Sequence, residues 1–395
     1  CRECIRWCSC LRIHIEELRI SSDMTRATVR VLGGEDKKRL TLSDGTVYEF
    51  SGDEITVEPA SPVLWSPENP HIYDFTLESG EDTVRSYFAL REIGTVTVDG
   101  IPRLTLNGKP YLFNGLLDQG YFPDGIFLPA TSDGYRDDIL LAKRLGFNVL
   151  RKHIKVEPDI FYTLCDRLGM IVFQDMVNNS GYSFIFDTAL PTLGMKRFPD
   201  TLLHRKKQSR KIFEAHMTDE IAYLDSHPSI LYYTVFNEGW GQFRADGMYA
   251  VAKASAPDKI IDATSGWFVR RESDVDSRHV YFKPLKVKAQ PTRPLVISEF
   301  GGYSHRVEGH LFGDGNYGYT ECESPEELYS KIERLYLGEV KDAILAGASG
   351  FIYTELSDIE DETNGFITYD REVLKVDEVK IKAIMDELAG TVSAL

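Results

Sequence analysis

The chain has 395 residues, of which 43% are apolar and 27% charged, and its 45 basic and 61 acidic side chains give a formal net charge of −16. This excess of acidic side chains argues against nucleic acid or an anionic membrane surface as a partner, because both require clustered positive charge. No stretch approaches the roughly 18 consecutive apolar residues of a membrane helix, so we expect a protein that acts on a neutral or locally recognised small molecule.

The cysteines bear on metal binding and on the cellular compartment. They are Cys1, Cys4, Cys8, Cys10, Cys165 and Cys322. The spacing of the first four, C-x2-C-x3-C-x-C, does not repeat the paired C-x2-C modules of zinc sites, so we predict no metal. Arg2, Glu3 and Arg6 interrupt any apolar core of a signal peptide. We therefore expect a reduced, cytoplasmic protein, or a chain cut from a longer one.

Residues 1–98 are predicted to be all-β. Short segments rich in β-branched and aromatic residues alternate with turn signals such as Gly33-Gly34, Asp44-Gly45 and Ser79-Gly80. Regular short strands with such turns are typical of a small β-sandwich.

Residues 99–395 have a different rhythm, in which apolar runs alternate with longer amphipathic stretches. The runs cover residues 111–114, 148–151, 170–174, 230–236, 260–263, 279–282, 295–298 and 350–354. Continuous apolar strands that alternate with helices indicate a parallel sheet. Eight such units in about 290 residues predict a (β/α)8 barrel, an α/β fold.

Two glutamates directly follow barrel strands, where such barrels carry their chemistry. Glu238 comes after the fourth run and Glu299 after the seventh. Two carboxyl groups across a barrel mouth are what glycoside hydrolysis requires: one protonates the leaving oxygen, and the other attacks the anomeric carbon or activates water. The distance between the two carboxyl groups distinguishes these mechanisms. It is ~5–5.5 Å in retaining enzymes, where the second carboxylate attacks, and ~6.5–9.5 Å in inverting ones, where it activates water.

The chain resembles glycoside hydrolase family 2, the β-galactosidase, β-glucuronidase and β-mannosidase family. The motifs lie in the order expected over nearly the whole chain: 64–73 and 88–93 of the sandwich, 148–153 and 165–169 around strand two, Asn237-Glu238, 262–267 and 274–279 near strands five and six, 298–301 around Glu299, and 364–371. The resemblance implies an immunoglobulin-like sandwich before a TIM barrel and a retaining mechanism without a cofactor.

The resemblance also implies roles for the polar residues. Glu238 corresponds to the acid/base, Asn237 to its asparagine partner and Glu299 to the nucleophile. Asn237 can donate to the sugar 2-hydroxyl, a contact that strengthens in the transition state. Glu238 must begin protonated, which requires a raised pKa, and Arg151 at the end of strand two is expected to keep Glu299 ionised.

Further residues at or near strand ends are candidates for the sugar subsite, with ordinary packing or capping as the alternative. They are His153, Asp175, Trp267, His279 and Tyr353. The acidic run 358–362 is interpreted as a solvated loop rather than a cation site. The long insertion 178–201, with its aromatic residues, is a candidate wall for the aglycone.

Two departures from the family qualify these expectations. The family's jelly-roll domain is missing before the sandwich, so we expect a fragment of a longer protein. Glu362-Thr363-Asn364 stands where the β-glucuronidases carry an asparagine-x-lysine motif, so no cation meets a uronate carboxylate there. We therefore favour a neutral sugar, galactose first, with glucuronide, mannoside or a catalytically silent carbohydrate-binding barrel as alternatives. A homo-oligomer is left open.

Overall fold

The computed structural model describes residues 14–178, 183–185, 200, 204, 206–268 and 270–393. The four N-terminal cysteines and most of the aromatic insertion 178–201 lie outside the described residues, so their predicted roles stay untested. No helix in these described ranges combines the length and the apolar character needed to cross a membrane.

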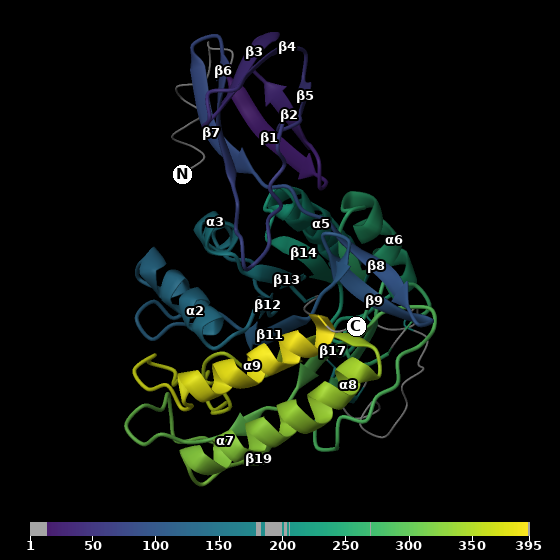
Figure 1. Ribbon diagram of the computed structural model, residues 1–395. Helices are drawn as coiled ribbons and strands as arrows, with labels where there is room; N and C mark the ends of the chain where they lie inside the picture. Colours follow the sequence, from purple (N-terminus) through teal and green to yellow (C-terminus); the bar gives the residue numbers. More distant parts are fainter. Residues whose placement is uncertain are drawn as a thin grey trace.

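The N-terminal strands form two antiparallel sheets, seen as the upper lobe in Figure 1. One sheet has the order β1-β2-β5 and the other β4-β3-β6-β7. The strands are β1 (Ile15–Ser22), β2 (Ala27–Gly33), β3 (Lys37–Leu42), β4 (Val47–Ser51), β5 (Glu54–Val57), β6 (Tyr73–Ser79) and β7 (Asp82–Phe88). Alternate residues such as Val29, Leu40 and Leu77 are fully buried between the sheets. This is the arrangement of an immunoglobulin-like sandwich, as predicted.

Among the described residues, eight parallel strands form one sheet with the order β15-β14-β13-β12-β11-β20-β17-β16, a nearly closed barrel. The strands are β11 (Phe113–Asp118), β12 (Val149–Lys152), β13 (Ile171–Asp175), β14 (Ile230–Thr234), β15 (Ile260–Asp262), β16 (Asp276–Val280), β17 (Leu295–Phe300) and β20 (Ala348–Tyr353). Each overlaps one of the eight apolar runs, because strands buried on both faces are apolar almost throughout, although β16 begins three residues before the predicted run 279–282. The predicted α/β barrel is confirmed.

Helices surround these strands (Figure 1). They are α2 (Ser132–Arg144), α3 (Asp159–Leu168), α5 (Lys207–Leu224), α6 (Ala245–Ser255), α7 (Pro325–Arg334), a π-helical turn η3 (Leu335–Val340), α8 (Lys341–Leu345) and α9 (Glu378–Ser393). Two short strands, β18 (Tyr303–Ser304) and β19 (Thr320–Glu321), pair in the loop region after β17.

The barrel strands bury two different apolar layers. Val149 of β12 belongs to the layer inside the barrel, whereas Leu150 belongs to the layer between strands and helices. Since successive side chains point to opposite faces of a strand, Arg151 again points inward. This alternation decides which residues reach the centre of the barrel mouth.

A hairpin closes the N-terminal end of the barrel. It is built from β8 (Ile93–Val98), β9 (Ile101–Leu106) and the short β10 (Lys109–Pro110). Its buried Leu104 and Leu106 pack in the same layer as the barrel interior. The predicted division into 1–98 and 99–395 falls within this hairpin, and it stays a prediction.

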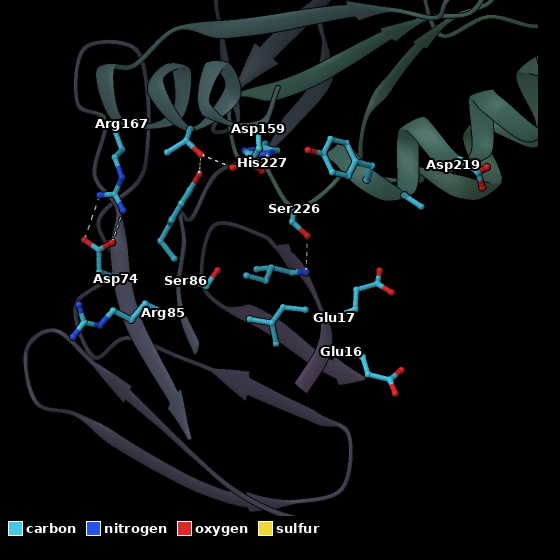
Figure 2. Close-up of a pocket in the computed structure, with 16 residues that line it drawn as sticks. Glu16, Glu17, Asp74, Arg85, Ser86, Asp159, Arg167, Asp219, Ser226 and His227 are labelled. Atoms are coloured by element: carbon cyan, nitrogen blue, oxygen red, sulfur yellow. Dashed lines mark hydrogen bonds and ion pairs between the residues drawn. The ribbon is translucent and has the colours of Figure 1, made fainter. Parts of the chain in front are cut away.

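Buried Asp166 of α3 joins the sandwich to the barrel. Its carboxylate accepts a hydrogen bond from the Tyr87 hydroxyl of the sandwich (2.6 Å) and from the Ser229 backbone N–H (2.8 Å), and it lies 2.7 Å from His227 Nδ1. Beside this contact lies a cavity of about 840 Å³ between the two modules, shown in Figure 2. His227 lines it and also contacts Asp159 at 3.2 Å.

The His227 contact predicts a pH-dependent part of the stability. Burial alone would lower the pKa of His227, but Asp159 and Asp166 outweigh it and raise the pKa to about 9. An unfolded histidine titrates near ~6.5, so this contribution is fully present below that pH and is lost as the pH rises through about 9. We expect urea unfolding to show a loss of up to about 3 kcal/mol across this window.

In His227→Gln this part of the pH dependence should vanish, whereas the control His216→Gln, at an exposed position of α5, should keep it. An unchanged pH profile in His227→Gln would contradict the assignment.

Candidate active site

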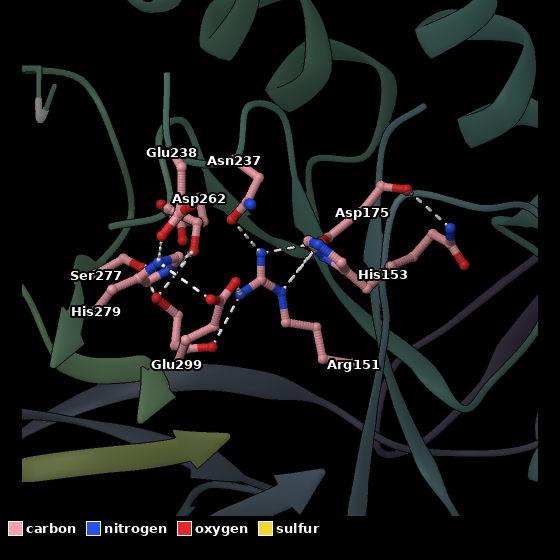
Figure 3. A network of polar contacts seen from close by, with 12 residues as sticks. Arg151, His153, Asp175, Asn237, Glu238, Asp262, Ser277, His279 and Glu299 are labelled. Carbon is pink, nitrogen blue, oxygen red and sulfur yellow. Dashed lines mark hydrogen bonds and ion pairs between the residues drawn. The ribbon is translucent and has the colours of Figure 1, made fainter. Parts of the chain in front are cut away.

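The strand ends at the C-terminal mouth of the barrel bring five predicted site residues together (Figure 3). Arg151 is the last but one residue of β12, Asp175 ends β13, Asn237 and Glu238 follow β14, and Glu299 lies near the end of β17. Their polar atoms form one connected network, which Glu238 joins through His279.

Irregular pairing turns Glu299 toward this network. Val296 belongs to the interior layer and Ile297 to the outer layer, so simple alternation would point Ser298 inward and Glu299 outward. The register of β17 shifts between Ile297 and Phe300 against β20, and β16 shifts at Arg278 and His279 against β17. Such bulges re-aim side chains, and they are frequent beside active sites.

Glu299 is 5% exposed and each of its carboxylate oxygens has partners. Arg151 Nη1 donates to Oε1 at 3.0 Å, and the Tyr281 hydroxyl donates to Oε2 at 2.8 Å. His279 Nδ1 lies 3.3 Å from the same Oε2. Arg151 thus brings a positive charge, and Tyr281 a hydroxyl donor, to this carboxylate.

Arg151 is the centre of the network. Its guanidinium makes bonds of 2.9 to 3.1 Å to the Asp175 carboxylate, and its Nη2 donates to Asn237 Oδ1 at 2.9 Å. Burial alone would lower the pKa of Arg151, but Asp175 and then Glu299 outweigh it and raise the pKa. Because Oδ1 of Asn237 accepts from Arg151, its amide NH2 remains oriented to donate.

Glu238 occupies a different environment. Its backbone has φ +50, a conformation that non-glycine residues adopt at a cost and that clusters at functional sites. Its N–H donates to the Ser265 carbonyl at 2.9 Å, and its Oε1 lies 2.8 Å from His279 Nδ1. Burial raises the pKa of Glu238 despite the charges of His153 and Arg151.

His279 bridges the two glutamates and is itself held in place. Burial lowers its pKa to about 4, so the imidazole is neutral at physiological pH. Its Nε2 lies 2.9 Å from the Ser265 hydroxyl. The backbone at Gly266 (φ +87) lies against the ring, where a Cβ would approach within 2.5 Å. When Nε2 accepts from Ser265, Nδ1–H donates to Glu238.

The two glutamate side chains are close. One ligand atom each from Glu238, His279 and Glu299 lie within 4.8 Å of one another. One oxygen of each carboxyl group is therefore within 4.8 Å of the other, which is compatible with the ~5–5.5 Å between carboxyl groups of retaining glycosidases.

The family model of the TIM barrel domain of glycosyl hydrolases family 2 matches residues 96–313. The chain belongs to this family. A β-galactosidase of Aeromonas hydrophila subsp. hydrophila is 28% identical over 287 residues, which are 64% of this chain and 26% of that protein. The chain therefore spans about a quarter of the length of this curated relative.

Solved structures share the fold of this family 2 chain. A β-D-glucuronidase of Dictyoglomus thermophilum has a TM-score of 0.69 and 17% identity, and the match covers 97% of this chain and 69% of that one. A β-glucuronidase of Faecalibacterium prausnitzii has a TM-score of 0.70 and 16% identity over 96% and 66%. At these identities the likeness concerns the fold.

The other predicted subsite residues have different surroundings. His153 Nδ1 lies 2.8 Å from Asp175 Oδ2, at the edge of the network. Trp267 is half-buried in the loop after β15. Tyr353 lies outside the network: it is 1% exposed and packs against Phe300 in the layer between strands and helices. The structure thus brings all the predicted residues to the mouth region except Tyr353.

Sequence reasoning missed part of this family 2 site. Tyr281 directly follows β16. Its ring stacks on Tyr319 with the ring centroids 3.7 Å apart, and its hydroxyl lies 2.7 Å from Thr354 Oγ1. Its place at the end of the apolar run 279–282 was a signal that a strand-end rule would have caught. Thr354 and Glu355 follow β20 and were likewise overlooked.

The interpretation of 358–362 as a solvated loop is wrong in part. Glu360 is exposed, but Asp358 is 3% exposed and forms an ion pair with Lys375 at 2.5 Å. Lys375 also donates to the Thr363 carbonyl at 2.9 Å, and the Gly365 N–H donates to Asp358 at 2.9 Å. The run is therefore pinned at its start rather than freely solvated.

Two groups among the described residues have the donor atoms for a metal ion: Glu238 with His279 and Glu299, and His310 with Asp370 and Glu372. The first group is engaged in hydrogen bonds with Tyr281, Arg151 and Ser265. In the second, Glu372 is exposed, and clustered surface carboxylates are common without an ion.

Proposed function

We propose that this family 2 chain is the catalytic part of a retaining β-glycosidase that removes a terminal β-linked sugar, with Glu299 as nucleophile and Glu238 as acid/base. The observation that supports this proposal most strongly is that the two carboxyl groups have different surroundings. Glu299 is held by a cation and a hydroxyl donor, whereas burial raises the pKa of Glu238, and both contact His279. Two carboxyl groups in such different environments take different roles: the one with the raised pKa is the acid, and the one held by a cation is the nucleophile.

In the first step of the proposed reaction, Glu299 attacks the anomeric carbon and the bond to the leaving oxygen breaks. Glu238 gives its proton to that oxygen, which leaves as an alcohol, and a glycosyl ester of Glu299 forms. In the second step Glu238, now ionised, takes a proton from water, which attacks the anomeric carbon and releases Glu299. Two inversions retain the β configuration.

Asn237 and Arg151 support this sequence. The Asn237 amide, oriented by Arg151, is placed to donate to the sugar 2-hydroxyl as positive charge develops on the ring. Arg151 and Tyr281 keep the carboxylate of Glu299 from turning away from the sugar, since they occupy both of its oxygens. His153 and Trp267 are proposed to line the same subsite.

A neutral sugar, galactose first, is the proposed substrate. The sequence relative cited above is named a β-galactosidase, and the segment Glu362-Thr363-Asn364 offers no cation to a uronate. The nearby described lysines are engaged: Lys152 with Asp118 at 3.0 Å and Lys375 with Asp358. The fold neighbours named β-glucuronidases keep a glucuronide as the alternative, and a mannoside remains a third.

We expect nitrophenyl β-galactoside to be hydrolysed with at least about tenfold higher kcat/KM than nitrophenyl β-glucuronide, since leaving a uronate carboxylate without a partner costs 1–3 kcal/mol or more. A panel that adds the β-glucoside and β-mannoside measures this directly. A clear preference for the glucuronide would contradict the neutral-sugar proposal, and a panel without any hydrolysis would favour the silent carbohydrate-binding barrel.

We also propose a cytoplasmic location, supported by Cys165 and Cys322, which are buried and free in the part of the chain that the structure describes. The acidic composition supports a carbohydrate rather than nucleic acid as the partner. A homo-oligomer stays open and would be decided by light scattering.

A further inference from the structure

A chain of buried hydroxyl groups leads from His279 into the barrel. Ser265 Oγ lies 2.9 Å from His279 Nε2, and the Ser265 and Ser298 hydroxyl oxygens are 2.9 Å apart. The Ser298 hydroxyl lies 2.6 Å from that of Ser277, which hydrogen-bonds the carboxylate of Asp262. All three serines and Asp262 are buried, and Figure 3 shows Asp262 and Ser277 beside His279. The proposed two-step reaction assigns no role to this serine chain.

The serine chain bridges the seam of the barrel and has a fixed end. β15, which ends at Asp262, and β16, which carries Ser277, are the two edge strands of the eight-stranded sheet. Ser298 comes from β17, the neighbour of β16. Asp262 is also held from β14, since the Tyr232 hydroxyl donates to its Oδ2 at 2.9 Å.

The fixed end determines the direction of the hydrogen bonds. Burial raises the pKa of Asp262 to about 6, so at pH 7 it is a carboxylate that only accepts. The single hydrogen of Ser277 is thus directed to Asp262, and the short contact between Ser277 and Ser298 uses the hydrogen of Ser298. By the same count Ser265 donates to Ser298. The competing contact of Ser298 with the Arg278 carbonyl is longer, at 3.4 Å, and therefore weaker.

This direction selects one tautomer of His279. Because the hydrogen of Ser265 is already used, Ser265 accepts and His279 donates from Nε2. Since burial lowers the pKa of His279 to about 4, the imidazole is neutral and its Nδ1 then carries a lone pair. That lone pair lies 2.8 Å from Glu238 Oε1 and is matched by a protonated carboxyl group, not by a carboxylate. The opposite tautomer requires every hydroxyl of the chain to turn, which leaves Asp262 without the hydrogen of Ser277.

The charged groups around His279 agree with this tautomer. Glu299 Oε2 lies 3.3 Å from Nδ1, but it already accepts from the Tyr281 hydroxyl at 2.8 Å. Arg151 holds the other oxygen of Glu299 at 3.0 Å. Further charged or titratable groups that act on His279, Glu238 or Asp262 are His153, Asp175, Tyr232 and Tyr319. The tautomer is therefore decided on the Nε2 side of the ring, by Ser265.

We propose that Asp262 is a positioning residue, which through the serine chain fixes the hydrogen of His279 on Nε2 and so keeps Glu238 protonated before the first step. Once Glu238 has given its proton to the leaving group, its carboxylate faces the Nδ1 lone pair. This makes it a stronger base toward water in the second step. The inference rests on the proposed function and adds the residues that control the proton of its acid/base.

The tautomer of His279 is measured by heteronuclear NMR of the whole chain with isotope-labelled histidines, because the nitrogen that bears the hydrogen has a distinct chemical shift. His279→Gln identifies the signals of this ring among the nine histidines. The wild type should carry the hydrogen on Nε2. Ser298→Ala interrupts the chain, and Asp262→Asn places an amide that can donate at its accepting end. Both variants should shift the ring toward the Nδ1–H form.

The second readout is the pH profile of kcat/KM on an alkyl β-galactoside, whose leaving oxygen needs a proton. The alkaline limb reports the loss of the Glu238 proton in the free enzyme. One hydrogen bond corresponds to roughly one pH unit, so Ser298→Ala should lower the alkaline limb by about that amount. This variant changes no charge, so the acidic limb should stay in place.

The matched control is Ser349→Ala, in which a buried serine of β20 is replaced toward the other end of the barrel. Its hydroxyl accepts from the Leu104 N–H at 3.1 Å and is remote from the serine chain. Neither the tautomer nor the pH profile should change in this variant. Thermal unfolding of each variant verifies that it is folded, and Ser277→Ala replaces Ser298→Ala if that variant does not fold.

The outcomes separate the inference from the proposed function. A hydrogen on Nδ1 in the wild type overturns the inference, and so does a tautomer or an alkaline limb that the interrupted chain leaves unchanged. The tautomer is measured without substrate. An Nε2–H ring that shifts in Ser298→Ala, in a protein that hydrolyses no glycoside, therefore overturns the proposed function while it supports the serine chain.

Discussion

Replacing Glu299 by alanine should reduce the hydrolysis of every β-glycoside by a factor on the order of 10⁶, the cost typical of removing a nucleophile. The loss should be the same for good and poor leaving groups, because no glycosyl ester can form with either. Added azide can enter the space that the carboxylate leaves and attack from the same side. The product should then be the α-glycosyl azide, after a single inversion.

The control for this variant is Glu326→Ala, in the exposed first turn of α7, which should keep wild-type activity. Thermal unfolding should verify that Glu299→Ala is folded, since Arg151 loses a buried partner there. Near wild-type turnover of an unactivated glycoside by Glu299→Ala would contradict the assignment, and so would a β-azide product.

Replacing Glu238 by alanine should have an effect that depends on the leaving group. A sugar alkoxide needs a proton to depart, so disaccharide hydrolysis should fall by roughly 10²–10⁴-fold, the range that positioned proton transfer supplies. Dinitrophenolate leaves without a proton, so the first step should remain fast. The second step also loses its base, so the glycosyl-enzyme should accumulate as a burst in stopped-flow measurements.

Azide, which needs no base, should restore the turnover of Glu238→Ala and give the β-glycosyl azide. This product is the opposite anomer to that expected of Glu299→Ala, so the pair of variants distinguishes the two roles. An exchange of the two anomers between the variants would reverse the assignment. A uniform loss on all substrates in Glu238→Ala would indicate that Glu238 does more than transfer protons.

Much of the fold could be predicted because buried parallel strands leave a direct trace in the sequence. The run 295–298, followed by Glu299, marks both a strand and the polar residue at its end. Arg151 could be matched to Glu299 because both lie near the ends of strands that end at the same mouth. The sandwich was recognisable by its regular turns, since each short strand there requires one.

The residues that were missed or misplaced depend on the face on which a side chain emerges. Tyr353 was predicted from its place at the end of a strand, but Ile352 faces the barrel interior and Tyr353 therefore faces the helices. One residue of register reverses the face, and bulges such as the one near Glu299 alter the count again.

The burial of Asp358 in the acidic run 358–362 was hidden for a different reason. An acidic run is usually solvated, so 358–362 was interpreted in that way. Only tertiary structure shows that Lys375, thirteen residues after Glu362, folds back to neutralise Asp358 and to pin the loop. Local composition carries no information about such a long-range partner.

The central claim, a covalent intermediate on Glu299, is tested most directly by trapping it. The protein would be incubated with a 2-deoxy-2-fluoro-β-galactoside bearing a dinitrophenolate leaving group, digested, and mapped by mass spectrometry. We predict one fluorogalactosyl group on the peptide that contains Glu299 and none on the peptide that contains Glu238. A label on Glu238, or no adduct in a protein that still hydrolyses the ordinary galactoside, would contradict the account.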